Sequence, residues 1–181
     1  MENAVAGWHT EHVYFRRLLS LLQRQVEVFR TGERPNYEMM LDIISYLREF
    51  ADRFHHPRED AAFARLAKRV PEMKPDLDHL SQEHEVIAQA GETLFNQLNA
   101  ILAGAIVSRS EIGLAAASYL VNYGNHIAKE EEDILARAAK ELTPADWKAV
   151  KDAAPVGLDP VFGDKPEERY KELRRQIALD A

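Results

Sequence analysis

Hydrophobic residues recur three and four positions apart along most of this 181-residue chain, and this helical period limits its fold more than any other feature. Four long segments carry the period, at about residues 5–30, 36–70, 76–107 and 110–142. No segment shows the alternation of polar and apolar residues that is typical of a strand. Because long helices joined by short connections pack antiparallel, the sequence predicts an all-α, up-down four-helix bundle over residues 1–142.

The pattern changes over residues 143–181. A Thr-Pro helix start predicts a short helix over about residues 143–152. A connection rich in Pro and Gly follows at 154–163, and a last helix is predicted at about 165–178. We interpret this part as a helical appendage, and the side chains expected to pack it on the bundle are Trp147, Leu158 and Phe162.

Composition excludes several classes of function. The formal net charge is -7, so the chain lacks the basic surface that nucleic-acid binding needs. It has no cysteine, and any metal must therefore be held by His, Asp, Glu or Tyr. The N-terminus does not resemble a signal peptide, and the best apolar stretch, 114–121, is too short to span a bilayer. These features predict a cytoplasmic protein with neither nucleic acid nor membrane as a partner.

Three of the predicted long helices place a histidine on their apolar face, where side chains three and four apart align. The face of the first helix consists of His12, Phe15, Leu19, Leu22, Val26 and Phe29. The face of the third consists of Leu77, Leu80, His84, Ile87, Gly91, Leu94, Leu98, Ile101 and Ala105. The face of the fourth consists of Ile112, Ala116, Tyr119, Tyr123, His126 and Glu130.

The second helix adds a histidine and a carboxylate that share a face. His55 and Glu59 are four residues apart, roughly 6 Å along a helix axis. The fourth helix repeats this spacing with His126 and Glu130. Pro57 lies between His55 and Glu59 and predicts a kink in the second helix.

Four inward imidazoles and two inward carboxylates, with no Lys or Arg opposite them, require a cation. A single histidine on an apolar face is usually a hydrogen-bonded core residue, but four of them on four helices indicate a metal site. Helical bundles build di-metal sites from His and carboxylate ligands on facing helices, and this donor set suits iron, manganese or zinc better than calcium. The predicted ligands are His12, His55, Glu59, His84, His126 and Glu130.

Several neighbouring side chains leave alternatives open. His56 is compatible with a role as an extra ligand, with a contact to a ligand, or with an alternative His56/Asp60 register. His9 lies one turn before His12 and is a candidate for lining the site, whereas His79 is expected to face solvent.

On the fourth helix, the choice of Glu130 over Glu131 rests only on the four-residue spacing. Tyr119 and Tyr123 share the inner face, where core packing is the expected role.

The order of the predicted ligands resembles the H-HxxxE-H-HxxxE signature of the hemerythrin-like (HHE) family over about residues 5–142. The resemblance implies an up-down four-helix bundle with two irons and an oxo or hydroxo bridge, for which zinc or manganese are substitutes. It further implies that the four histidines are terminal ligands and that Glu59 and Glu130 bridge the two irons.

One departure from the family bears on function. Oxygen-carrying hemerythrins have a His-x-x-x-His pair on the third helix, but the residues four positions from His84 are Leu80 and Ala88. Fewer histidines predict open coordination, which favours binding or sensing of O2 or NO, or handling of iron and oxidative stress, over reversible oxygen carriage. A di-iron peroxidase-like or oxidase enzyme, and a structural bundle with zinc or no metal, stay open. Any signalling role would need a separate protein partner.

Overall fold

The computed structural model describes residues 4–154 and 157–179, and this part of the chain contains helices and no strand. The all-α class predicted from the sequence is therefore confirmed. In chain order the elements are α1 (Ala4–Arg30), α2 (Tyr37–Tyr46), the π-helix η1 (Leu47–His55), α3 (His56–Arg69), the 3-10 helix η2 (Pro71–Met73), α4 (Lys74–Leu102), α5 (Arg109–Lys129), the π-helix η3 (Glu130–Ile134), α6 (Leu135–Glu141), α7 (Pro144–Ala153), the 3-10 helix η4 (Glu168–Tyr170) and α8 (Lys171–Leu179).

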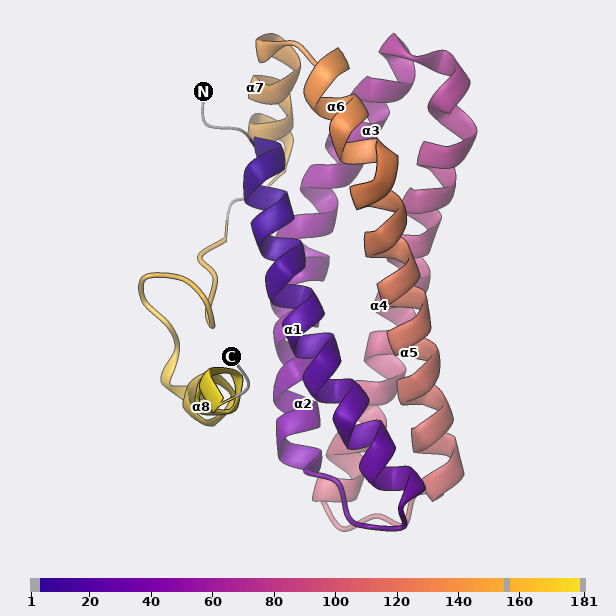
Figure 1. Cartoon of the computed structure of the whole chain (residues 1–181), viewed down its shortest axis with the longest axis vertical. Coiled ribbons are helices and arrows are strands. Elements are labelled where there is room, and N and C mark those ends of the chain that lie inside the picture. Colours follow the sequence, from indigo (N-terminus) through magenta and orange to yellow (C-terminus); the bar gives the residue numbers. More distant parts are fainter. Residues whose placement is uncertain (1–3, 155–156, 180–181) are drawn as a thin grey trace.

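The long helical stretches lie alongside one another and form the body of the molecule (Figure 1). Two of them are continuous runs of several elements, α2–η1–α3 and α5–η3–α6, and the other two are α1 and α4. The main contacts run between α4 and α5, between α1 and α5, and from α2 and α3 to α4. The predicted second and fourth helices thus exist, but each contains a π-helical segment.

The core has two apolar clusters with a polar layer between them. On α1, His12 lies between Trp8 of the smaller cluster and Phe15 of the larger one. Farther along α1, all apolar members of the predicted face are buried, and each fully buried large side chain stabilises the fold by about 1.5–3 kcal/mol. On α4, His84 lies in the same way between Leu80 and Ile87. The two clusters hold the polar layer at one level of the bundle.

The third predicted helix ends earlier than the sequence analysis expected. α4 stops at Leu102, whereas the apolar spacing predicted a helix as far as Val107. The reason is Gly104, which adopts φ +88°, a left-handed conformation that glycine accommodates and that ends a helix. Ala105 is consequently exposed and does not extend the buried face.

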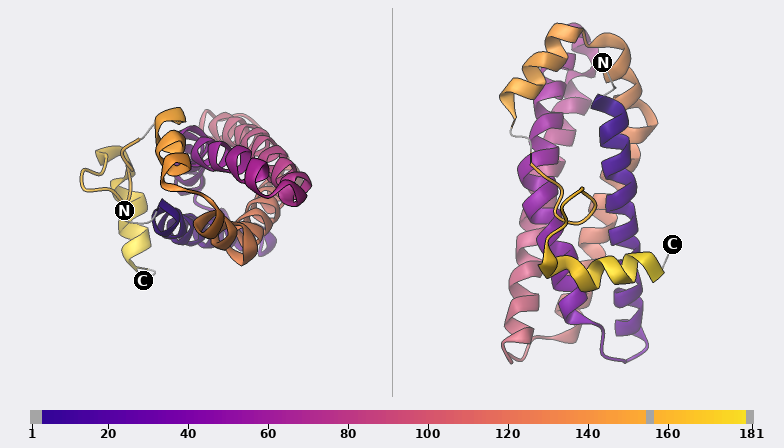
Figure 2. Two further views of the ribbon diagram at one scale, coloured as in Figure 1. Left: turned by 90° about the horizontal axis from the view of Figure 1, so that it is seen from above. Right: turned by 90° about the vertical axis from the view of Figure 1, so that its left-hand side faces the viewer.

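The appendage contacts the bundle in two places. α7 begins with a capping box between Thr143 and Asp146, and Trp147 packs edge-on against Trp8 with ring centroids 5.5 Å apart. The segment 157–179 crosses α1 and α2 lower down, where α8 lies across the bundle (Figure 2).

Of the other two side chains expected to pack the appendage, only Phe162 does so. Its ring stacks on Tyr14 at 4.1 Å, whereas Leu158 is 85% exposed, so the prediction for Leu158 was wrong. The cause is a turn in which the Asp159 carboxylate accepts hydrogen bonds from the N–H groups of Val161 and Phe162. This turn places Val161 and Phe162 against the bundle and leaves Leu158 outside.

Candidate metal centre

Both His-x-x-x-Glu motifs lie where a π-helix meets an α-helix. η1 ends at His55, and the N–H of His56 donates to the carbonyl of Ala51, five residues back. η3 begins at Glu130, whose carbonyl accepts from the N–H of Leu135. Single π-helical turns inside α-helices are frequent at functional sites.

Pro57 explains the first of these segments. It has no N–H to donate to a carbonyl of the preceding turn, so regular α-helical bonding cannot continue through it. The disruption predicted at Pro57 takes the form of the π-helix η1, and the chain resumes as α3.

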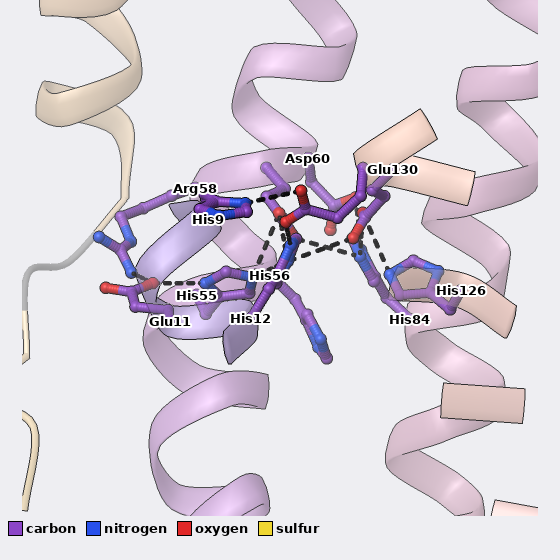
Figure 3. Close-up of polar contacts among 12 residues, drawn as sticks. His9, Glu11, His12, His55, His56, Arg58, Asp60, His84, His126 and Glu130 are labelled. Atoms are coloured by element: carbon purple, nitrogen blue, oxygen red, sulfur yellow. Dashed lines mark hydrogen bonds and ion pairs between the residues drawn. The ribbon is translucent and has the colours of Figure 1, made fainter. Parts of the chain in front are cut away.

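The six predicted ligands are buried in the polar layer and meet there, together with His56 (Figure 3). Two sets of side chains each bring potential ligand atoms within 4.8 Å of one another. The first group consists of His12, His55 and Glu59, and the second group consists of His56, Glu59, His84 and His126.

Glu59 belongs to both groups and extends between them. Its Oε1 lies 3.1 Å from Nε2 of His55 and 3.4 Å from Nε2 of His12. Its Oε2 lies 3.5 Å from Nε2 of His84. The two oxygens therefore face different groups, as in a carboxylate that bridges two cations.

Glu130 has the same arrangement from the opposite side. Its Oε2 lies 3.4 Å from Nε2 of His12 in the first group. Its Oε1 lies 3.1 Å from Nε2 of His126 and 3.6 Å from Nε2 of His84 in the second group. The neighbouring Glu131 points outward instead and contacts the Nδ1 atoms of His9 and His12.

The buried polar atoms at the centre of this layer test whether a metal fits. Both oxygens of Glu59, both oxygens of Glu130 and the Nε2 atoms of His84 and His126 are buried without a hydrogen-bond partner. Leaving a buried polar atom unsatisfied costs about 1–3 kcal/mol, and more for a charged group. Six such atoms directed at one another fit a site for cations.

The first group gives a second test. The Nε2 atoms of His12 and His55 face each other at 2.9 Å. The Nδ1 atom of each ring already faces a carboxylate, which favours the ring proton at Nδ1 and leaves a lone pair on Nε2. Either an added proton or a metal cation must lie between two such lone pairs.

Every inward imidazole also has a carboxylate at its outer nitrogen. Contacts of this kind fix the orientation of a ligating histidine and raise its basicity. The distances from Nδ1 are 2.7 Å for His12 to Glu131, 2.5 Å for His55 to Glu11, 3.2 Å for His56 to Asp52, 3.0 Å for His84 to Asp60, and 3.0 Å for His126 to Glu83.

Two exposed histidines contact these outer carboxylates. His9 lies 2.7 Å from Glu131, and His79 lies 3.0 Å from Glu83, which also binds Lys129. The His79 side chain is 62% exposed, as predicted. Both histidines are thus outside the two groups.

The protonation of the metal-free site follows from these contacts. Burial lowers the pKa of His55, but Glu59 and Glu11 outweigh it and raise the pKa to about 9. Burial opposes the charged form of His84 as well, yet Asp60 and Glu130 raise its pKa to about 12. Without metal, these imidazoles carry protons that balance the buried carboxylates, so a metal ion must displace them.

The sequence leaves the role of His56 open, and the structure places this residue in the second group. It is buried, and its ring stacks on that of His84 at 4.2 Å. Burial and the neighbouring imidazoles lower its pKa well below the usual range, so it offers a neutral ring. His56 therefore adds a third imidazole to the second group, beside those of His84 and His126.

The two tyrosines of the fourth helix are fully buried beside the second group. The Tyr123 hydroxyl lies 3.4 Å from Nε2 of His56, and the rings of Tyr119 and Tyr123 are 5.5 Å apart. Neither tyrosine belongs to the two ligand groups.

A buried cluster of imidazoles joined by carboxylates inside a helical bundle is typical of metal-ion-binding bundle proteins. The family model of the hemerythrin HHE cation binding domain matches residues 3–138, and the chain belongs to this family. Comparisons with curated proteins and with solved structures gave no match. In the part of the chain that the structure describes, no helix has the length and apolarity needed to cross a membrane.

Proposed function

We propose that this chain is an antiparallel up-down four-helix bundle with a non-haem di-iron centre that binds a small diatomic ligand, O2 or NO. The observation that carries the proposal is the unequal size of the two ligand groups. The first group offers two imidazoles, the second offers three, and Glu59 and Glu130 reach both. A metal ion held by the first group would therefore have one protein donor fewer than a metal ion held by the second group. This first metal position leaves room for an exogenous ligand.

The side chain of Phe15, next to the first group, favours a small uncharged ligand. The Phe15 ring is fully buried and packs edge-on against His55, with ring centroids 4.9 Å apart. It lies 6.2 Å from the His12 ring. This buried apolar ring limits the space beside the first metal position and disfavours the binding of charged species there.

The chain's own residues hold the site in place. Glu59 and Glu130 balance the cationic charge, and the outer carboxylates orient the imidazoles. Iron bound here would supply reversible coordination or redox chemistry toward a diatomic ligand; zinc or manganese would be substitutes, and zinc, which has no redox chemistry, would not supply it.

The test starts from protein stripped of metal under anaerobic conditions. Addition of Fe(II) should load about two irons per chain, measured by elemental analysis. Exposure to NO should then give a saturable change in the optical spectrum with about one NO per chain. Protein that takes up no iron, or iron-loaded protein whose spectrum NO leaves unchanged, would disprove the proposal.

A di-iron peroxidase-like or oxidase activity is the second candidate. The observation that favours it is Tyr123, an oxidisable side chain whose hydroxyl lies 3.4 Å from His56. Repeated turnover of peroxide with a reducing dye, slowed by Tyr123→Phe, would support the enzyme. Reversible loss of an O2-induced spectrum after the gas is removed would instead support a carrier.

A further inference from the structure

The C-terminal segment 157–170 lies on the helical stretch that carries His55. It crosses the outer side of α1 and α2 (Figure 2). The Asp159 carboxylate accepts a hydrogen bond from the Tyr46 hydroxyl at 2.9 Å, and Tyr46 is the last residue of α2. Arg169 donates to Glu49, which lies in η1. The segment therefore contacts the chain at the start of η1 and inside it.

A third contact falls on the residue that precedes His55. A Cβ atom added to Gly157 would lie 2.6 Å from Cγ and Cδ2 of Phe54. Real Cβ atoms do not approach so closely, and Cγ is the atom nearest the backbone of that ring. Any side chain at position 157 would therefore force the Phe54 ring or the backbone at position 157 to move.

Phe54 is connected to the candidate metal centre by hydrogen bonds through Arg58 and Glu11, and Figure 3 shows Arg58, Glu11 and His55. Its carbonyl accepts from Nε of Arg58 at 2.6 Å. Arg58 donates to Glu11 at 2.6 Å, and the same Glu11 oxygen lies 2.5 Å from Nδ1 of His55. The backbone of Phe54 is thus linked through Arg58 to the carboxylate that contacts His55.

The π-helical conformation of η1 makes this contact important for the site. π-Helices are uncommon and form short segments, and the same residues in an α-helix would point in different directions. His55 is the last residue of η1, so its direction depends on that conformation being kept. The contacts at Tyr46, Glu49 and Phe54 are spread along η1, from its N-cap to the residue before His55.

We propose that residues 157–170 form a clamp that holds η1 in its π-helical conformation and thereby positions His55 in the first ligand group. The clamp makes the first metal position depend on the C-terminal appendage. The second group depends on the clamp only through His56 and Glu59, which follow η1, because its other two members, His84 and His126, come from α4 and α5. This inference rests on the proposed function, since the positioned residue is one of its proposed ligands.

The test uses the full-length protein with two matched pairs of variants. Gly157→Ala presses on Phe54, whereas Gly113→Ala adds the same methyl group where no atom lies within 4 Å. Asp159→Asn weakens the contact with Tyr46, whereas Asp146→Asn alters a carboxylate elsewhere in the appendage that pairs with Arg69. The second pair keeps the test informative if Gly157→Ala folds poorly.

The first measurement is an anaerobic titration with Co(II), followed by its absorption bands. His55→Ala identifies which of the two binding steps belongs to the first group. Gly157→Ala and Asp159→Asn should weaken that step about tenfold, the lower end of the effect of contacts behind a ligand, and weaken the other step by a smaller factor. Unchanged binding at both steps, or equal weakening of both, would overturn the clamp.

The second measurement is amide hydrogen exchange of η1 in metal-free protein. Both clamp variants should exchange faster than the wild type over residues 47–56, and both control variants should not. Equal exchange in all five proteins would overturn the clamp. If the wild type bound no Co(II) or Fe(II), the proposed function would fail, and this exchange measurement would still decide whether the clamp holds η1.

Discussion

Removal of the metal should make the stability of the protein fall as the pH rises from about 6.5 to about 9. The carboxylates of Glu59 and Glu11, acting against burial, give His55 a pKa of about 9 in the folded metal-free site, compared with about 6.5 in an unfolded chain. A group whose pKa is raised on folding stabilises the fold fully below its unfolded value. That contribution is lost as the pH rises through the folded value.

The difference between the two pKa values of His55 corresponds to a loss on the order of 3 kcal/mol in the free energy of unfolding. His84 changes stability in the same direction, because its folded pKa is raised to about 12. His56 does not contribute in this range. Its folded pKa is lowered, so it is neutral in both folded and unfolded protein above about pH 6.5.

Urea unfolding measures this loss. Chelator-treated protein is unfolded at several pH values between about 6.5 and 9, and circular dichroism monitors the transition. Metal-loaded protein is the control and should depend less on pH, because metal has displaced the protons. His55→Gln should reduce the slope, because it removes one of the protonated groups. A free energy of unfolding that stays constant over this range in the stripped protein would refute the reasoning.

Three further predictions concern single side chains. His56→Ala should lower bound iron from about two ions to about one per chain, whereas His79→Ala should leave the iron content unchanged. Elemental analysis measures both, and an equal loss of iron in the two variants would show that the assignment of His56 to the second ligand group is wrong. Thr143→Ala should destabilise the protein by about 1 kcal/mol in thermal unfolding, because it removes a capping box, and an unchanged midpoint would contradict this. Leu22→Ala should cost about 2–5 kcal/mol in urea unfolding, and Leu114→Ala, at a 71% exposed position, should stay within about 0.5 kcal/mol; similar losses would refute the core assignment.

The helical stretches and the inward histidines could be predicted because both depend on short-range periodicity. Residues three and four apart share a face of a helix, so His12 and His84 are placed by their apolar neighbours alone. The same spacing paired His55 with Glu59 and His126 with Glu130. This reasoning does not require knowledge of which helix lies beside which.

The same periodicity could not predict the π-helices or the place of His56. A π-helix changes the direction of the residues that follow it, so α-helical spacing through η1 gives the wrong face for His56. Pro57 was the available signal, since it lacks an N–H, but it indicates a disruption without specifying its form. The end of α4 was missed for a related reason, because the conformation of Gly104 decides it.

The carboxylates behind the histidines depend on tertiary structure. Glu11 and Glu83 directly precede His12 and His84 in the chain, yet they contact His55 and His126 instead. Consecutive residues on a helix point about 100° apart, so the neighbour of an inward histidine faces the adjacent helix. Sequence proximity therefore indicates the wrong partner, and only the packing order of the helices gives the right one.

These contacts between helices close into a ring around the bundle. Glu11 on α1 binds His55 at the end of η1, and Asp60 on the following α3 binds His84 on α4. Glu83 on α4 binds His126 on α5, and Glu131 in η3 returns to His12 on α1. Each helical stretch thus carries an inward imidazole and a carboxylate that contacts the imidazole of a neighbouring stretch. Displacement of any one stretch disturbs two of the proposed ligands at once, and for this reason we expect metal binding and folding of the bundle to be coupled.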